Sequence, residues 1–468
     1  MHTNNGQQLP VAVLGAGPVG LAAAAHLVER GFAPLVLEAG PAVGANLAGY
    51  RHVRLFSPWR YNIDKAARRL LQAGGWQAPA DDVLPTAGEL LDDYLLPLAG
   101  STAIAAKVRL GHRVTAITRL GFDKVRTRGR EGAPFLIRAD TAGGPRQYLA
   151  SAVIDATGTW SHPNPLGANG IPALGEAALA ARIDYGMPDV LGAARAHFAG
   201  RRVLVVGAGH SAAGTLLALA QLAKDHPGTS IVWATRGSRL ARVFGGGAAD
   251  GLQARGQLGM RLQALRDAGG LALHQDFRIE ALVEVEGRIR VVGEARDGVA
   301  PTIDGIDRIV CATGARPDLA LTRELRVRHD PWLESTDALA PLIDPNEHSC
   351  GTVRPHGHRE LAHPEPGYYA VGAKSYGRAP NFLMATGYEQ VRSVVAALAG
   401  DMEAADDVQL DLPQTGVCNT RLAYEDAPAE PAACCNVSAA VAASCCVPAP
   451  APSGACGCGK PADVGCCA

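Results

Sequence analysis

Short apolar runs that end in glycine-rich turns recur along this chain, and they predict strands. Residues 11–14 lead into Gly15-Ala16-Gly17, and residues 203–206 lead into Gly207-Ala208-Gly209. After the first turn, an alanine-rich segment at 21–30 predicts a helix. This alternation of strand and helix is typical of α/β domains built on a parallel sheet.

The first glycine turn carries the pattern that binds the pyrophosphate of a dinucleotide. Glycine lets backbone N–H groups approach the phosphates, and the N-terminus of the following helix adds partial positive charge. The next strand, residues 34–37, ends in Glu38, whose carboxylate can accept both hydroxyl groups of an adenosine ribose. A purely structural βαβ unit is the alternative. We expect a dinucleotide site that includes Gly15, Gly17, Pro18, Gly20 and Glu38.

The second glycine turn differs from the first in two ways. Ala212 takes the place of the third glycine, and the next strand, residues 231–234, ends in Thr235-Arg236 without an acidic residue. A carboxylate would repel the 2′-phosphate of NADPH, whereas a guanidinium group can bind it with two parallel hydrogen bonds. Unless Arg236 is only a solvated surface residue, NADPH is expected at Gly207, Gly209, His210, Ser211 and Arg236. A flavin in the first site would complete a redox pair.

Segments later in the sequence predict further parts of these two sites. The predicted strands 152–155 and 308–312 each lead into an Ala-Thr-Gly turn, where a backbone can pass close to a cofactor. Residues 368–373 predict a strand and glycine turn, and residues 386–398 predict a helix whose N-terminus can lie near a flavin ring. The expected contacts here are Val114, Ala156, Thr157, Gly158, Ala312, Thr313, Gly314, Gly372, Asn381 and Phe382.

The order of these segments predicts the domain organisation. At about 150 residues per domain, the 468 residues suggest roughly three units. We expect an α/β protein with two Rossmann-like domains, in which an NADPH-binding domain (196–333) is inserted into a discontinuous FAD-binding domain (1–195 and 334–407). Residues 408–468 are expected to form a flexible, cysteine-rich tail.

The tail holds nine of the eleven cysteines. Adjacent thiolates are soft ligands suited to trivalent arsenic, mercury or Cu(I), and in a reducing cytosol they favour metal binding over a structural disulfide framework. The alternative is low-complexity sequence with adventitious thiols. The predicted ligands are Cys434, Cys435, Cys445, Cys446, Cys456, Cys458, Cys466 and Cys467.

Charge and hydropathy exclude several classes of partner. The net charge of −1 gives no reason to expect nucleic acid or an acidic membrane surface. The polar first ten residues resemble no signal peptide, and no apolar run is long enough to span a membrane. We expect a cytoplasmic protein whose partners are a small-molecule or metalloid substrate and, for an oxygenase, O₂.

Three further groups of residues permit two interpretations each. Side chains at 54–60, among them Ser57 and Trp59, can flank a flavin ring or can pack the core. Lys374 can contact an anionic group or solvate a loop. The histidines of 348–363 can bind a metal together with Cys350 or can simply form hydrogen bonds; Cys350 is also the candidate catalytic thiol.

With these landmarks, residues 9–402 resemble the flavoproteins with two dinucleotide-binding domains, especially the flavin-dependent monooxygenases. The resemblance implies FAD at the Gly15 turn and NADPH at the Gly207 turn. Ala-Pro-Asn-Phe-Leu at 379–383, its flanks and the cysteine-paired tail resemble more narrowly a group of flavoprotein monooxygenases encoded in arsenic-resistance operons.

Two departures from related families limit the chemistry. Residues 1–407 contain no Cys-x-x-Cys, which a disulfide reductase of the usual dithiol type needs beside its flavin. Leu204 stands where the monooxygenase motif Phe-x-Gly-x-x-x-His has its histidine, which places Baeyer–Villiger chemistry in doubt. The expected activity is NADPH-dependent flavin reduction followed by oxygenation of a thiophilic substrate or by electron transfer to tail thiols. The alternatives are a metalloid-binding protein with a structural flavin module and an amine N-hydroxylase.

Overall fold

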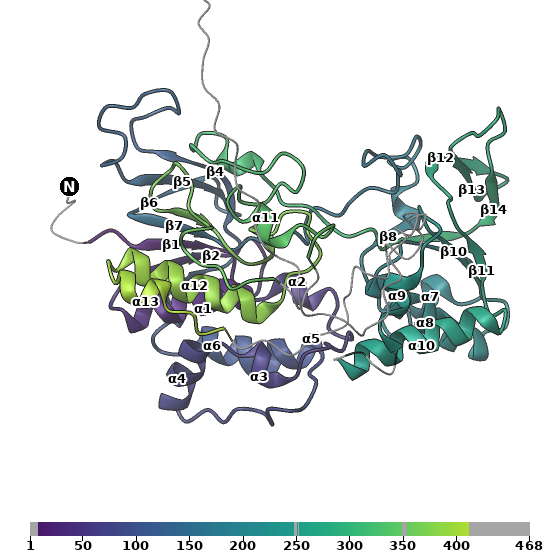
Figure 1. The fold of residues 1–468 in the computed structure, drawn as a ribbon, viewed down its shortest axis with the longest axis horizontal. Coiled ribbons are helices and arrows are strands. Elements are labelled where there is room, and N and C mark those ends of the chain that lie inside the picture. Colours follow the sequence, from purple (N-terminus) through teal and green to yellow (C-terminus); the bar gives the residue numbers. More distant parts are fainter. Residues whose placement is uncertain (1–7, 248–249, 251, 349–352, 411–468) are drawn as a thin grey trace, which may run out of the picture. The chain divides into compact units, whose positions relative to one another are not determined.

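The computed structural model describes residues 8–247, 250, 252–348 and 353–410 (Figure 1). Within these ranges the chain forms two five-stranded parallel sheets and two three-stranded antiparallel sheets. The expected α/β architecture with two Rossmann-like sheets is confirmed.

The first parallel sheet has the strand order β16-β7-β1-β2-β3. All four residues of β1 are buried, as expected for a strand covered on both faces. Because β16 pairs with β7, a segment that follows the second unit in sequence completes the first sheet. The strands are β1 (Val11–Leu14), β2 (Pro34–Leu37), β3 (Val108–Arg109), β7 (Ala152–Asp155) and β16 (Tyr368–Ala370).

Helices α1 and α12 pack together beside this sheet and share its largest apolar core (Figure 1). Asp64 caps α4 by accepting a hydrogen bond from Ala67 N at 2.9 Å, and its other oxygen contacts His26 Nε2 of α1 at 3.0 Å. The helices of this unit are α1 (Pro18–Glu29), α2 (Ala45–Ala48), α3 (Trp59–Asn62), α4 (Lys65–Ala73), α5 (Ala87–Glu89), the π-helix η1 (Leu90–Leu95), α6 (Leu96–Gly100), η2 (Ala105–Lys107), η5 (Ala320–Thr322), α11 (Ala340–Ile343), η6 (Gly372–Lys374), α12 (Met384–Leu398) and α13 (Met402–Asp406).

The second parallel sheet has the order β11-β10-β9-β15-β8. Its elements are β8 (Ile183–Tyr185), β9 (Arg202–Val206), β10 (Ser230–Ala234), β11 (Ala272–His274), β15 (Arg308–Cys311), η3 (Ala180–Arg182), α7 (Arg195–Phe198), α8 (His210–Asp225), α9 (Ala241–Phe244) and α10 (Gln253–Asp267). The antiparallel sheets contain β4 (Arg113–Arg119), β5 (Phe135–Asp140) and β6 (Arg146–Ala150), and β12 (Ile279–Val285), β13 (Arg288–Gly293) and β14 (Thr302–Ile306).

The second sheet uses residues that precede position 196, where the sequence placed its start. Strand β8 pairs in parallel with β15, and Leu166, Ala173 and Leu179 join the apolar core beneath it. A three-residue edge strand carries too few apolar positions to show a periodic pattern. The second unit therefore includes part of the segment that we had placed in 1–195.

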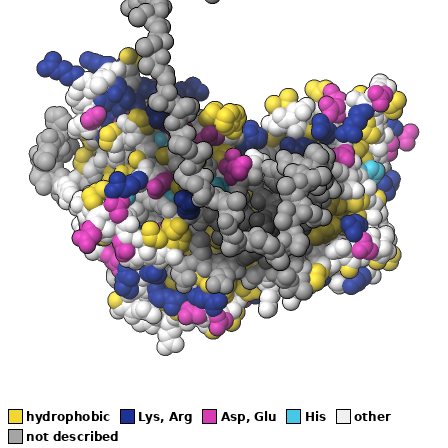
Figure 2. Space-filling model, in the orientation of Figure 1, with side chains coloured by type: hydrophobic (Ala, Val, Ile, Leu, Met, Phe, Trp, Pro, Cys, Tyr) yellow, Lys and Arg dark blue, Asp and Glu magenta, His cyan; other side chains and the backbone are white. Residues whose placement is uncertain are grey.

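No helix among the described residues is both long enough and apolar enough to cross a membrane. Acidic and basic side chains both occur across the face shown in Figure 2. Several are paired, such as Arg51 with Asp92 and Arg68 with Asp81. Exposed pairs of this kind contribute little to stability, so the packing of the two parallel sheets carries the fold.

A buried carboxylate joins the β4–β6 sheet to the segment that leads into β16. Glu365 Oε1 accepts hydrogen bonds from Arg119 Nε at 2.8 Å and Arg130 Nη1 at 2.7 Å, and Oε2 accepts one from Arg326 N at 2.9 Å. Its side chain is fully buried. Burial raises the pKa of Glu365, but the hydrogen bonds from Arg326, Arg130 and Arg119 outweigh it and leave the pKa below its usual value.

Replacement of this carboxylate is expected to destabilise the protein strongly. Glu365→Gln leaves Arg119 and Arg130 buried without a counter-charge, which costs about 3–5 kcal/mol of unfolding free energy. Urea denaturation at pH 7 measures this loss, and Asp92→Asn in an exposed pair, expected to cost at most about 1 kcal/mol, is the control. Because folding lowers the pKa of Glu365, its contribution is complete above about pH 4.3 and declines as the pH falls through the folded-state pKa. A wild-type advantage that did not shrink in acid would contradict this explanation.

Candidate functional site

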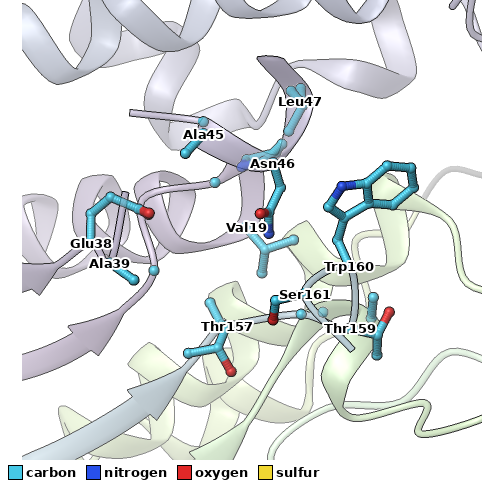
Figure 3. Close-up of a pocket in the computed structure, with 18 of the residues that line it drawn as sticks. Val19, Glu38, Ala39, Ala45, Asn46, Leu47, Thr157, Thr159, Trp160 and Ser161 are labelled. Atoms are coloured by element: carbon cyan, nitrogen blue, oxygen red, sulfur yellow. The ribbon is translucent and has the colours of Figure 1, made fainter. Parts of the chain in front are cut away.

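A cavity of about 580 Å³ lies at the carboxyl ends of β1, β2 and β7, where ligands bind in open α/β sheets (Figure 3). Its volume is in the range of small-molecule sites. Figure 3 shows α2 residues, including Asn46, on one side and the turn from Thr157 to Ser161 on the other. Sequence-predicted residues that line it are Gly15, Gly17, Pro18, Glu38, Val114, Ala156, Thr157, Gly158, Gly372 and Phe382.

The three glycines of the first turn meet different surroundings. Gly15 has φ +93°, and a Cβ atom there would lie 2.9 Å from the carbonyl oxygen of Ala156. A Cβ on Gly20 would lie 2.0 Å from the carbonyl oxygen of Gly15. Gly17 has φ −83°, and nothing lies within 4 Å of a Cβ built on it. Gly15 and Gly20 are therefore required by the fold, whereas Gly17 keeps a side chain out of the cavity.

Glu38 is held by the backbone at the end of β2. Its Oε2 accepts a hydrogen bond from Ala16 N and its Oε1 accepts one from Gly40 N, both at 2.7 Å. A carboxylate has about four acceptor positions, so two remain for the hydroxyl groups of a ribose. The carboxylate therefore both fixes the glycine turn and lines the cavity.

The second glycine turn repeats this geometry. Gly207 has φ +132°, and a Cβ there would lie 2.4 Å from the carbonyl oxygen of Ala312. Gly209, with φ −105°, is the N-cap residue of α8; it provides no side-chain cap, and nothing lies within 4 Å of a Cβ built on it. A helix N-terminus of this kind can bind an anion. His210 and Ser211 form the first turn of α8, and the His210 ring meets the Phe56 ring edge-on at 5.3 Å.

Arg236 follows β10 in an exposed position. Its Nη1 donates a hydrogen bond to the carbonyl oxygen of Ala168 at 3.3 Å. The Ala-Thr-Gly turn after β15 is held by Thr313, whose hydroxyl donates to the carbonyl oxygen of Asn164 at 3.1 Å. The predicted elements of the second site are therefore present at the carboxyl ends of β9, β10 and β15, with Gly314 at φ +85°.

Several cavity residues escaped the sequence analysis. Tyr50 and Trp160 line the cavity, with ring centroids 4.6 Å apart, and burial raises the pKa of Tyr50 to about 12. Trp160 follows the Ala156 turn in sequence, which was the one available signal. Tyr50 lies between short helices without periodic pattern. The other unexpected polar residues of the lining are Asn46, His112, Arg113, Thr159, Ser161, His162 and Asp318.

Some predicted contacts lie away from the cavity lining. Trp59 is buried in the core, and Ser57 donates a hydrogen bond to Asn62 Oδ1 at 2.8 Å, so both have packing roles. Asn381 is buried and donates to the carbonyl oxygen of Ile343 at 3.2 Å. Lys374 neither contacts solvent nor lines the cavity; it is buried in an ion pair with Asp155.

The histidines at 348–363 form separate hydrogen bonds. His348 contacts the carbonyl oxygen of Pro341 at 2.9 Å, His356 contacts that of Arg354 at 2.9 Å, and His358 contacts Asp406 at 2.9 Å. Among the described residues, no three His, Cys, Asp or Glu side chains are arranged to hold a metal ion. Cys350 and the eight cysteines predicted as tail ligands lie outside the described residues.

Comparison with known proteins supports the dinucleotide-binding assignment. Residues 13–78 match the NAD(P)-binding Rossmann-like domain family. A comparison with curated proteins gave no match. The matched segment contains the Gly15 turn and Glu38, so the family match and the cavity geometry concern the same residues.

Solved structures share the fold over most of their length. Bacillithiol disulfide reductase from Bacillus cereus has a TM-score of 0.62 at 18% identity, covering 84% of this chain and 99% of that chain. DfoA from Erwinia amylovora, a cadaverine monooxygenase solved with FAD, has a TM-score of 0.59 at 15% identity, covering 87% of this chain and 97% of that chain. Ornithine N-hydroxylase from Kutzneria sp. 744, solved with reduced FAD and NADP⁺, has a TM-score of 0.56 at 16% identity, covering 85% of this chain and 100% of that chain. At these identities the matches show a shared fold, while the family match and the geometry of the Gly15 turn support a dinucleotide in the first site.

Proposed function

We propose that this chain is an FAD-dependent NADPH oxidoreductase of the monooxygenase type that acts on a thiophilic substrate. The observation that carries the proposal is the duplicated site. Each parallel sheet presents a glycine turn pressed against an Ala-Thr-Gly turn, and the first of these opens into the 580 Å³ cavity. Two dinucleotides in one chain form a complete hydride-transfer unit.

In this scheme the residues of the chain bind and orient the two cofactors. Glu38 would accept hydrogen bonds from the ribose hydroxyl groups, the turn at Gly17 would lie against the pyrophosphate, and Tyr50 and Trp160 would provide aromatic walls. A flavin held there would supply two-electron chemistry, with NADPH as the hydride donor. The overall balance for an oxygenase is NADPH, a proton, O₂ and substrate giving NADP⁺, water and the oxygenated substrate.

The link to arsenic rests on the resemblance of 379–383 and on the cysteine pairs of the tail. Trivalent arsenic is soft and binds neighbouring thiolates. An amine N-hydroxylase is the second candidate, because the similar structures include a cadaverine monooxygenase and an ornithine N-hydroxylase. NADPH oxidation measured with arsenite, cadaverine and ornithine in turn distinguishes them: stimulation by arsenite alone supports our proposal, and stimulation by an amine overturns its substrate class.

The two open glycines allow each cofactor site to be tested without damage to the fold. Gly17→Ala places a methyl group in the cavity and should abolish the yellow colour, while the melting temperature of the flavin-free protein stays unchanged. Gly209→Ala, its counterpart, should retain FAD and lose reduction by NADPH. Flavin absorbance and stopped-flow reduction measure the two effects. Full FAD retention by Gly17→Ala would show that the dinucleotide does not approach this turn.

Arg236 is expected to select NADPH over NADH. Loss of a bidentate, charge-assisted phosphate contact costs about 1.5–3 kcal/mol, so Arg236→Ala should raise the Michaelis constant for NADPH roughly ten- to a hundredfold and leave that for NADH nearly unchanged. The control is Arg288→Ala, because Arg288 pairs with Asp307 at the opposite end of β15. An equal effect on both cofactors would assign Arg236 a structural role.

The tail is expected to capture thiophilic ions without taking part in flavin reduction. The chain should be cut after Leu410, because α13 belongs to the fold: Asp406 contacts His358 and Arg359, and Ser393 Oγ donates to the carbonyl oxygen of Ala405 at 2.7 Å. The truncated protein should be reduced by NADPH at nearly the full rate but should no longer bind arsenite stoichiometrically, as measured by mass spectrometry. Full-length protein with the eight predicted tail ligands replaced by serine should behave identically; arsenite binding retained by both would place the ion elsewhere.

A further inference from the structure

A buried ion pair links two turns that border the cavity. Lys374 Nζ donates a hydrogen bond to Asp155 Oδ2 at 2.6 Å, and both side chains are at most 1% exposed. Asp155 ends β7, directly before the Ala156 turn, and Lys374 ends η6, which begins at Gly372. The removal of two charges from water is costly, so this pair must be closely satisfied by its partners.

The hydroxyl of Thr157 connects the ion pair to the cavity wall. Thr157 Oγ1 donates to Asp155 Oδ1 at 2.7 Å and accepts from Lys374 Nζ at 3.1 Å. Tyr368 OH donates to Asp155 Oδ2 at 3.0 Å. Because the single proton of the Thr157 hydroxyl is committed to Asp155, Thr157 can offer a ligand only its methyl group, its backbone or an acceptor position. Thr157 itself lines the cavity.

The opposite turn is fixed from beneath as well. Gln390 Oε1 accepts a hydrogen bond from Gly372 N at 2.7 Å, and Gln390 Nε2 donates to Ser375 Oγ at 2.9 Å. Ser375 Oγ donates in turn to the carbonyl oxygen of Gly372 at 2.8 Å. These hydrogen bonds hold the Gly372 turn together. Val371 N donates to the carbonyl oxygen of Asp155 at 2.9 Å, and Lys374 extends this link to the hydroxyl group of Thr157.

In the second unit the equivalent Ala-Thr-Gly turn has no acidic residue at the position of Asp155. Cys311 ends β15 at the position that Asp155 has in β7, and its Sγ lies 3.2 Å from Thr313 Oγ1. Burial raises the pKa of Cys311 to about 11, so this partner is a neutral thiol. The Thr313 hydroxyl group is held by neutral partners, this thiol and the carbonyl oxygen of Asn164. In the first unit, by contrast, the equivalent hydroxyl group contacts both members of a buried ion pair.

We propose that Lys374 is a positioning residue for the flavin: through Asp155 and Thr157 it sets the spacing between the Ala156–Gly158 and Gly372–Lys374 walls of the cavity. The inference rests on the proposed binding of FAD in this cavity. A wall displaced by a fraction of an ångström changes the contacts of a bound ring system, because sites depend on the residues that support them. Lys374 then affects how the flavin is held without touching it.

The test compares three variants of the full chain. Lys374→Met leaves Asp155 buried and unpaired. The double variant Asp155→Asn, Lys374→Met removes both charges and keeps the shape, so it should fold. Thr157→Val removes only the hydroxyl group through which Lys374 reaches the cavity. We expect the FAD dissociation constant to rise about tenfold or more in all three, the lower end of the range seen for outer-shell partners of metal ligands.

Visible circular dichroism of the bound flavin separates positioning from mere stability. The double variant and Thr157→Val should both change this spectrum in the same direction. The control, Asp250→Asn with Arg255→Met, removes a different buried ion pair, from the second unit, and should change the melting temperature but not the spectrum.

The outcomes decide between the two proposals. If the wild type binds no FAD, the proposed function fails. If the wild type binds FAD but the double variant and Thr157→Val keep its affinity and spectrum, only the role of Lys374 is overturned. If the double variant does not fold, Thr157→Val decides in one direction: unchanged affinity and spectrum overturn the role of Lys374, because they show that the hydroxyl group it reaches does not affect the flavin.

Discussion

The contact between a glycine and the neighbouring carbonyl group is the constraint on which both cofactor sites depend. In each parallel sheet the first glycine of the turn faces the backbone of the Ala-Thr-Gly turn on the neighbouring strand. There is room for a hydrogen atom but not for a Cβ atom, which would lie 2.9 Å from the carbonyl oxygen of Ala156 at Gly15 and 2.4 Å from that of Ala312 at Gly207. Both glycines also have positive φ angles, a second reason why other residues are disfavoured at these positions. The strand ends can approach only because of these glycines, and each turn then leads directly into the N-terminus of α1 or α8.

This constraint explains which parts of the molecule the sequence predicts well. A glycine required by geometry leaves a mark in the sequence, and so does an acid that must end β2. The strands β1, β2 and β7 were predicted with the bounds that the structure shows, because each is a short apolar run closed by such a residue. The insertion of the second unit followed from the strand and glycine turn at 368–373.

The rest of the site depends on contacts between distant segments, which no local pattern encodes. Tyr50 and Trp160 meet across about a hundred positions of sequence and together form a wall. Lys374 looked like a solvated or anion-binding residue because a lysine in a Gly-rich turn is usually exposed. Its burial is visible only once Asp155, more than two hundred residues earlier in the chain, is placed beside it. The short strand β8 was missed because its pairing with β15, rather than its composition, makes it a strand.

The two copies of the Ala-Thr-Gly turn show how a duplicated framework becomes specialised. Both copies hold the threonine hydroxyl by the side chain two residues earlier, yet one uses Asp155 and the other Cys311. The thiol is neutral, and its turn is completed by neutral contacts with Asn164, whose carbonyl oxygen accepts from the Thr313 hydroxyl group at 3.1 Å. A buried carboxylate needs a charged partner, and the first unit obtains it from the segment that returns after the second unit and adds β16 to the sheet. The ion pair between Asp155 and Lys374 thus joins the two sequence segments of the discontinuous domain at the edge of its cavity. In our proposal the same ion pair also sets the spacing between the two cavity walls.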